Sequence, residues 1–249
     1  MWTAARRLFG LVLALVWFGG AATASQCGSG IFESVPYTYC TANPVTDDIR
    51  LWHRDTDGAL LGTFDRIEAA LARDGLSLGF AMNGGMYHQD RSPVGLYVEG
   101  RRETSPIVTA DGPGNFGLLP NGVFCLRDGM AEITESRAFA VSGISCDYAS
   151  QSGPLMVAGG DLHPRFLPDG TSENIRNGVG VRPDGTVVFA ISDAPLNFHR
   201  FARLFRDALG TPDALYIDGR VSRLYAPALA RHDLGFPLGP IVGTAVPAD

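Results

Sequence analysis

The sequence contains no lysine, and all 20 of its basic residues are arginine. This absence excludes Schiff-base catalysis and a Walker-type phosphate lysine. The formal net charge is -6, which argues against general nucleic-acid binding. No internal repeat, low-complexity tract or long linker interrupts the chain. The composition therefore predicts a single globular domain after a short leader.

The leader is indicated by the first residues. A basic pair, Arg6 and Arg7, precedes an apolar run over 8–18 and the small residues of 22–24. This order predicts a secretory signal peptide over 1–24 and a mature domain over 25–249. The apolar run is shorter than the ~20 residues that a spanning helix needs. We therefore expect a periplasmic or secreted protein with no stable membrane anchor after cleavage.

Cysteine is scarce, with four residues in the whole chain. An even number of cysteines in an exported protein predicts two disulfides. Three pairings are open, and we expect the local one, Cys27–Cys40 and Cys125–Cys146, because each bond closes a short loop. No cysteine shares a polar motif with a histidine, so the sequence does not favour a catalytic thiol.

Short apolar runs separated by glycine and proline indicate many short strands. We expect strands at Leu78–Met82, Val94–Val98, Gly122–Leu126, Leu155–Ala158, Val179–Arg182, Thr186–Ile191 and Leu215–Ile217. Two stretches have helical periodicity. One begins at Phe64 and stops near Gly75, and the other follows an N-cap at Asn197 and stops near Gly210. The predicted fold class is α+β, a mixed β-sheet with flanking helices.

The C-terminal half predicts a more definite arrangement. The stretch NGVGVRPDGTVVFAI reads as a hairpin, and a helix and the strand ALYI follow it. Strand, helix and strand form a β-α-β crossover, which usually makes the two strands parallel. Parallel strands end at the same end of a sheet, where ligands usually bind. The polar residues expected to converge there are Arg176, Asn177, Asp193 and Asp218.

Each of these residues has a functional and a structural interpretation. Asp193 and Asp218 could act as a general acid/base pair or as metal ligands, but aspartates after strands are more often turn-forming. Arg176 could bind a phosphate with two parallel hydrogen bonds, or could form a surface salt bridge. The functional interpretation depends on their convergence.

Two further motifs place polar residues beside short strands. The motif AMNGGMY contains Asn83 and Gly84 at the end of a short apolar strand, and the motif QSGPLMV begins with Gln151 and Ser152. Ordinary glycine and polar turns are the structural alternatives, and Ser152 does not lie in a G-x-S-x-G nucleophile motif. His88 follows the first motif and could transfer protons, although an exposed loop position is the simpler interpretation.

Together these motifs resemble the phosphodiester glycosidase family. AMNGGMY, QSGPLMV, RNGVGVRPDG and ALYIDGRVS occur in that family's order and rough spacing, from about Gly79 to Tyr225. The resemblance implies a hydrolase that cleaves the sugar–phosphate bond of sugar-1-phosphodiesters, with phosphate leaving the anomeric carbon, and the predicted signal peptide makes it an exported one. The candidate site residues that it carries over are Asn83, Gly84, Gln151, Ser152, Arg176, Asp218, Gly219 and Ser222.

The sequence departs from the family at two places. The family usually shows Asp-Gly-Gly-Gly-Ser, whereas Arg220 and Val221 replace two glycines here. It often shows Arg-Thr-Ala, whereas Asn177 and Gly178 follow Arg176. Arg220 could narrow the pocket or clamp a phosphate, so we add Asn177 and Arg220 to the expected substrate contacts.

The resulting prediction assigns catalysis to Asp218 and Asp193 and names a sugar phosphodiester or phosphoglycan as the partner. No cofactor is certain, and a divalent metal is left open. A phosphate leaves readily as an anion, so one carboxylate acting as base for water could suffice. The alternative is a non-catalytic phosphoglycan-binding module or a structural envelope protein, and the altered Asp-Gly-Arg-Val-Ser segment is its best argument.

Overall fold

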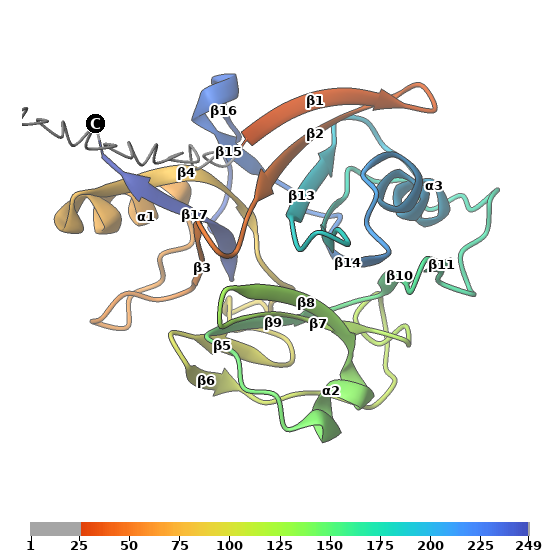
Figure 1. The fold of residues 1–249 in the computed structure, drawn as a ribbon, viewed down its shortest axis with the longest axis horizontal. Helices are drawn as coiled ribbons and strands as arrows, with labels where there is room; N and C mark the ends of the chain where they lie inside the picture. Colours follow the sequence, from red (N-terminus) through yellow and green to blue (C-terminus); the bar gives the residue numbers. More distant parts are fainter. Residues whose placement is uncertain (1–25, 249) are drawn as a thin grey trace, which may run out of the picture.

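The computed structural model describes residues 26–248, and the predicted signal peptide lies outside them. Three antiparallel sheets form the body of the described chain, with short helices at its periphery (Figure 1). This arrangement confirms the α+β class. Every pair of adjacent strands within 26–248 is antiparallel. No helix in the same range is long and apolar enough to cross a membrane.

The first sheet contains the predicted crossover. Its spatial order is β1 (Gln26–Phe32), β2 (Val35–Ala42), β13 (Val187–Ser192), β12 (Asn177–Val181), β14 (Asp213–Asp218), β10 (Leu155–Ala158) and β11 (Asp161–Leu162). Strand β12 pairs antiparallel with both β13 and β14. These two strands are therefore parallel to each other, on either side of β12. Asn177 is opposite both Ile191 and Asp218, which places the ends of all three strands together.

The crossover helix lies on one face of this sheet. Helix α3 (Phe198–Arg203) continues into the π-helical turn η2 (Leu204–Ala208) before β14 begins. The side chain of Asn197 accepts a hydrogen bond from Arg200 N at 2.9 Å, which confirms the predicted N-cap. Phe201 and Phe205 are fully buried beneath the helix and anchor it to the sheet.

The second sheet has the order β16 (Arg231–His232), β15 (Leu224–Ala226), β4 (Leu76–Asn83), β17 (Ile241–Pro247) and β3 (Asp48–Trp52). Helix α1 (Phe64–Leu71) packs on it through Phe64, Ile67 and Leu71, and it begins at Phe64 as the sequence predicted. The helix continues through η1 (Ala72–Asp74) to a left-handed Gly75. The short turn η3 (Pro227–Leu229) joins β15 to β16.

The third sheet has the order β6 (Arg102–Ser105), β5 (Tyr97–Glu99), β9 (Tyr148–Ser152), β7 (Gly122–Arg127) and β8 (Met130–Glu135). Helix α2 (Ser136–Ser142) follows β8. All three sheets contribute to one core. The ring of Phe189 in β13 lies 5.2 Å from that of Phe80 in β4 and 6.0 Å from that of Phe124 in β7. Such a contact between three sheets fixes the relative positions of their strand ends.

Both predicted disulfides are present. Cys27 and Cys40 are directly opposite each other in the β1–β2 hairpin. Cys125 of β7 bonds to Cys146, which precedes β9. The local pairing, one of the three open to the sequence, is therefore confirmed.

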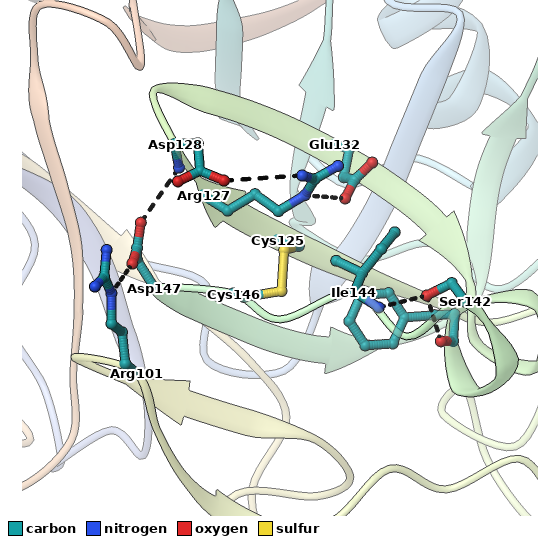
Figure 2. The surroundings of a disulfide bond; sticks show 10 residues. Arg101, Cys125, Arg127, Asp128, Glu132, Ser142, Ile144, Cys146 and Asp147 are labelled. Carbon is teal, nitrogen blue, oxygen red and sulfur yellow. Dashed lines mark hydrogen bonds and ion pairs between the residues drawn. A yellow bond between two sulfur atoms is a disulfide. The ribbon is translucent and has the colours of Figure 1, made fainter.

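The second disulfide is surrounded by polar contacts (Figure 2). Asp147, next to Cys146, forms an ion pair with Arg101 and accepts a hydrogen bond from Asp128 N at 3.3 Å. These contacts and the covalent bond hold the segment before β9 against β7. They stabilise the third sheet and lie outside the cleft described next.

Candidate active site

A cleft of about 570 Å³ opens beside the end of β14. Four segments line it: the loop after β4, a loop before β7, β14 itself and the turn that follows β14. The lining residues are Met86, Tyr87, His88, Gln89, Arg91, Val94, Pro113, Gly114, Asn115, Phe116, Tyr216, Asp218, Arg220 and Val221. Most of the charged or aromatic side chains in this lining belong to arginine, histidine, tyrosine and phenylalanine. Asp218 is the only carboxylate in this lining.

The carboxylate of Asp218 is held by neutral donors. Its Oδ1 accepts hydrogen bonds from Arg220 N at 2.7 Å and Val221 N at 3.3 Å, and its Oδ2 accepts one from Asn83 Nδ2 at 3.3 Å. Backbone donors two and three residues ahead are the pattern of an aspartate that shapes a turn. Because amides carry no charge, they orient the carboxylate without neutralising it. Asp218 therefore presents an oriented negative charge to the cleft.

Asn83, Asn177 and Ser222 support the turn that carries Asp218. Asn83 Oδ1 accepts from Arg223 N at 2.8 Å, and Asn177 Nδ2 donates to Asn83 O at 3.3 Å. The Ser222 hydroxyl lies 3.0 Å from Asp218 O and 3.4 Å from Asn177 Oδ1. Both asparagines are fully buried. The structure thus brings these predicted residues together with Asp218, and they join the ends of β4, β12 and β14 behind the cleft.

Arg176 is also brought to this end of the sheet, but it is buried and lies outside the lining. Its Nε donates to Leu196 O at 3.0 Å and its Nη2 donates to Ser172 O at 2.7 Å. The guanidinium carbon lies 3.7 Å from the ring centre of Phe198 and 5.5 Å from that of Tyr216. Burial lowers the pKa of Arg176, and the neighbouring Tyr216 opposes that shift.

Asp193 does not line the cleft. Its carboxylate accepts from Arg231 Nη1 at 2.6 Å and from the Thr38 hydroxyl at 2.7 Å. Its backbone N donates to Pro36 O at 2.8 Å. The ends of β13 and β14 converge as expected, but the two carboxylates meet different partners. A catalytic role for Asp193 stays a prediction.

Gln151, Ser152 and Gly84 hold the walls of the cleft. Gln151 Oε1 accepts from Leu96 N at 3.0 Å and Val108 N at 2.9 Å, which fixes the start of the loop that carries Asn115 and Phe116. Ser152 Oγ lies 3.4 Å from Ile217 O in β14. A side chain at Gly84 would meet the Ile241 backbone at 2.7 Å. These three residues pack against neighbouring backbone segments, so they support the walls of the cleft.

Several lining residues were not predicted from the sequence. Tyr87 and Arg91 come from the loop after β4, and the Arg91 guanidinium lies 5.2 Å from the Tyr87 ring centre. Burial, and then the charge of Asp218, raise the pKa of Tyr87. Tyr216 belongs to β14 itself. Tyr87 and Tyr216 both occur inside the quoted motifs, which is the one signal that could have identified them.

Gly219 is required by this packing. A side chain there would place its first carbon 2.3 Å from the Tyr216 hydroxyl and 3.4 Å from Arg176 Nη1. The first distance is a severe clash, so only glycine lets Tyr216 lie against the turn. Arg220, next along the chain, is exposed and lines the cleft.

The arrangement can orient water on a carboxylate and attract an anion. Arg91 and Arg220 supply positive charge beside Asp218, and the aromatic rings offer flat apolar surfaces for a sugar. Within residues 26–248, no group of three or more His, Cys, Asp or Glu side chains is placed to hold a metal ion. A divalent ion at this site would therefore have Asp218 as its one charged protein ligand.

Comparisons with known proteins agree on the family. The family model described as phosphodiester glycosidase matches residues 77–232. A protein of Escherichia coli K12, the uncharacterized YigE, is 35% identical over 185 residues, which cover 74% of this chain and 72% of that protein.

Solved structures share the fold at low sequence identity. The catalytic domain of zebrafish N-acetylglucosamine-1-phosphodiester alpha-N-acetylglucosaminidase, auto-inhibited by its pro-peptide, has a TM-score of 0.61 and 11% identity over 88% of this chain and 82% of that chain. A hypothetical protein from Synechocystis has a TM-score of 0.56 and 14% identity over 89% of this chain and 62% of that chain.

Proposed function

This chain belongs to the phosphodiester glycosidase family, and from that premise we propose that it is an exported hydrolase that cleaves the sugar–phosphate bond of sugar-1-phosphodiesters. The observation that carries the proposal is the oriented carboxylate of Asp218 in a cleft whose other charged groups are cationic. The name of the zebrafish enzyme points to the same class of bond. The sugar and the second substituent of the phosphate are left to experiment.

In this proposal Asp218 is the base for the attacking water. The water oxygen bonds to the anomeric carbon, the bond from that carbon to the phosphate oxygen breaks, and its electron pair leaves with the phosphate. Asp218 takes a proton from the water. A carboxylate is a weak base, but the leaving phosphate is a good anionic leaving group, so general base catalysis by one carboxylate suffices.

Arg220 and Arg91 are the proposed phosphate contacts. Arg220 is exposed in the lining directly after Gly219, and Arg91 faces the same cleft from the loop after β4. Guanidinium groups bind phosphate oxygens in pairs of charged hydrogen bonds. Arg176, expected from the sequence to bind phosphate, is separated from the lining by its burial. We therefore assign Arg176 a supporting role.

Export is part of the proposal. Two disulfides support it, because such bonds persist mainly in oxidising compartments. The expected mature start near Ser25 falls outside the described residues. Cell fractionation with N-terminal sequencing of the purified protein tests this step. Recovery of an uncleaved chain from the cytosol, with four free thiols, would contradict it.

The second candidate is a phosphoglycan-binding module without turnover. It is favoured by the backbone hydrogen bonds to Asp218 Oδ1, which a purely turn-forming aspartate would also make. A screen of sugar phosphodiesters, run with and without chelator and beside a binding titration, separates the candidates. Turnover supports the hydrolase, whereas saturable binding without turnover supports the module. A structural envelope protein predicts neither.

A further inference from the structure

Tyr216 brings a second polar group to the same cleft as Asp218. The two residues are separated by one position in β14, across a bulge where Tyr216 is opposite Gly178 and Asp218 is opposite Asn177. Both line the cleft. Only 2% of Tyr216 is exposed, and its ring packs edge-on at 4.7 Å from Phe198. The hydroxyl lies close to Gly219, at the turn that carries Asp218.

A buried positive charge lies behind this hydroxyl. Arg176 forms no salt bridge with any residue of 26–248, and it donates hydrogen bonds to the carbonyls of Leu196 and Ser172 and to the Ser172 hydroxyl. Its guanidinium stacks on Phe198 and faces Tyr216. A buried cation without a carboxylate partner is costly and is usually compensated by its surroundings. Here its charge makes the region beside Tyr216 attractive to an anion.

The neighbouring groups decide where the proton of the Tyr216 hydroxyl can go. The Arg176 guanidinium faces Tyr216, and Asn115 lines the same cleft. A guanidinium has no acceptor atom, so the Tyr216 hydroxyl cannot donate to Arg176. The single proton of the hydroxyl is then left for Asn115 or for a ligand in the cleft. Burial raises the pKa of Tyr216 to about 12, so the hydroxyl keeps this proton at neutral pH.

We propose that Tyr216 is a further catalytic residue, the hydrogen-bond donor to the phosphate oxygen that leaves the sugar, and that Arg176 is its positioning residue. This inference rests on the proposed function. As the bond between the anomeric carbon and the phosphate oxygen breaks, negative charge grows on that oxygen and Tyr216 stabilises it. Tyr216 keeps its own proton, and the proton of the attacking water goes to Asp218. The products are the free sugar and a phosphate monoester.

The first test is Tyr216→Phe, which removes the hydroxyl and keeps the ring. Because the donor acts on charge that develops in the transition state, kcat should fall about 10²-fold with little change in KM. Tyr148→Phe is the matched control, because Tyr148 lies in β9 outside the cleft lining, and it should keep the wild-type kcat. A folded Tyr216→Phe enzyme with kcat within about threefold of wild type would overturn the inference.

The second test asks whether Arg176 acts through Tyr216. Arg176→Lys should lower kcat about 10-fold in the wild-type background and cause no further loss in the Tyr216→Phe background. A purely structural role predicts the same loss in both backgrounds and would contradict the positioning role. If the lysine variant does not fold, Phe198→Leu, which removes the ring beneath the guanidinium, replaces it in the cycle.

Turnover by the wild-type protein distinguishes failure of the proposed function from failure of the role of Tyr216. If the wild-type protein hydrolyses no sugar phosphodiester in the screen, the proposed function and this inference both fail. If the wild-type protein turns over and Tyr216→Phe does so equally well, only the role of Tyr216 fails. The expected result is turnover by wild type and by Tyr148→Phe, with the 10²-fold loss confined to Tyr216→Phe.

Discussion

Two aspartates at one end of the seven-stranded sheet show how similar sequence positions acquire different chemistry. Asp193 follows β13 and Asp218 ends β14, and both come after apolar strands that run parallel. Asp193 is paired with Arg231 at 2.6 Å and with Thr38. Asp218 is held by two backbone amides and the amide of Asn83.

The difference lies in the charge of the partners. Arg231 comes from β16 of the second sheet and neutralises Asp193. Neutral amides leave the charge of Asp218 available to water or to a ligand in the cleft. The position at a strand end brings a carboxylate to this end of the sheet, and a contact from a distant segment decides whether its charge is paired. The predictions below test this contrast.

The largest effect is expected for Asp218→Asn. This change keeps the size of the side chain and removes its charge, so loss of a general base should lower kcat by about 10²–10⁴-fold with the fold retained. Steady-state kinetics and thermal unfolding measure both quantities. Chelator then divides the catalytic roles, because a metal ligand predicts that chelation also abolishes wild-type activity. Near-native turnover by a folded Asp218→Asn protein would reduce Asp218 to a turn former.

Burial, in place of a charged or an amide partner, controls a third carboxylate, that of Glu99. Burial raises the pKa of Glu99 from 4.5 to about 7, against a hydrogen bond from the Tyr97 hydroxyl at 3.0 Å. The folded state therefore binds a proton more tightly than the unfolded state. The stability that this provides is complete below pH 4.5 and is lost as pH rises through about 7.

The upper bound of that loss in the free energy of unfolding is about 3.5 kcal/mol, since each pKa unit corresponds to about 1.4 kcal/mol. Denaturant unfolding of wild type and Glu99→Gln between pH 4 and 8 measures it. The glutamine variant should show a smaller decline in the free energy of unfolding over that window. Parallel curves for the two proteins would show that Glu99 titrates normally.

Arg220 should contribute less than Asp218 to turnover. A charged hydrogen bond to phosphate is worth about 1.5–3 kcal/mol, so Arg220→Ala should raise KM by about 10–100-fold with a smaller change in kcat. Arg73→Ala, an exposed arginine of η1 outside the cleft, is the matched control. Equal KM values for wild type and Arg220→Ala would remove Arg220 from the phosphate site.

The smallest effect is expected for Asp193→Asn. An ion pair near the surface contributes about 0–1 kcal/mol, so the melting temperature should fall by no more than about 4 °C. Turnover should stay close to that of wild type because Asp193 is not in the cleft lining. A large loss of kcat in a folded Asp193→Asn protein would restore the sequence-based hypothesis of two catalytic aspartates.

The sequence predicted those parts of the fold that depend on local patterns. The hairpin of β12 and β13, the Asn197 cap and the return through β14 are consecutive in the chain, so turn and capping signals suffice to place them. Strand β17 lies between β4 and β3. These two partner strands lie more than a hundred residues earlier in the chain, and no local pattern in IVGTAVP predicts the pairing.

The same limit applies to the site. Asp218, Asn83 and Asn177 could be recognised because each terminates or begins an apolar strand. Arg91 and Asn115 lie in loops, which have no periodic pattern. Gln151 positions the loop that carries Asn115 by accepting hydrogen bonds from Leu96 N and Val108 N. The motif QSGPLMV singled out Gln151 as a substrate contact, which stays a prediction. Its packing role required the structure.

We propose that this cleft breaks the bond between the sugar carbon and the phosphate oxygen. Hydrolysis of a sugar-1-phosphodiester in water labelled with heavy oxygen tests it directly, with the products separated and weighed by mass spectrometry. Attack at the anomeric carbon, assisted by Asp218, predicts that the label appears in the released sugar and that the phosphate monoester is unlabelled. Label in the phosphate monoester would show attack at phosphorus and would contradict the glycosidase mechanism.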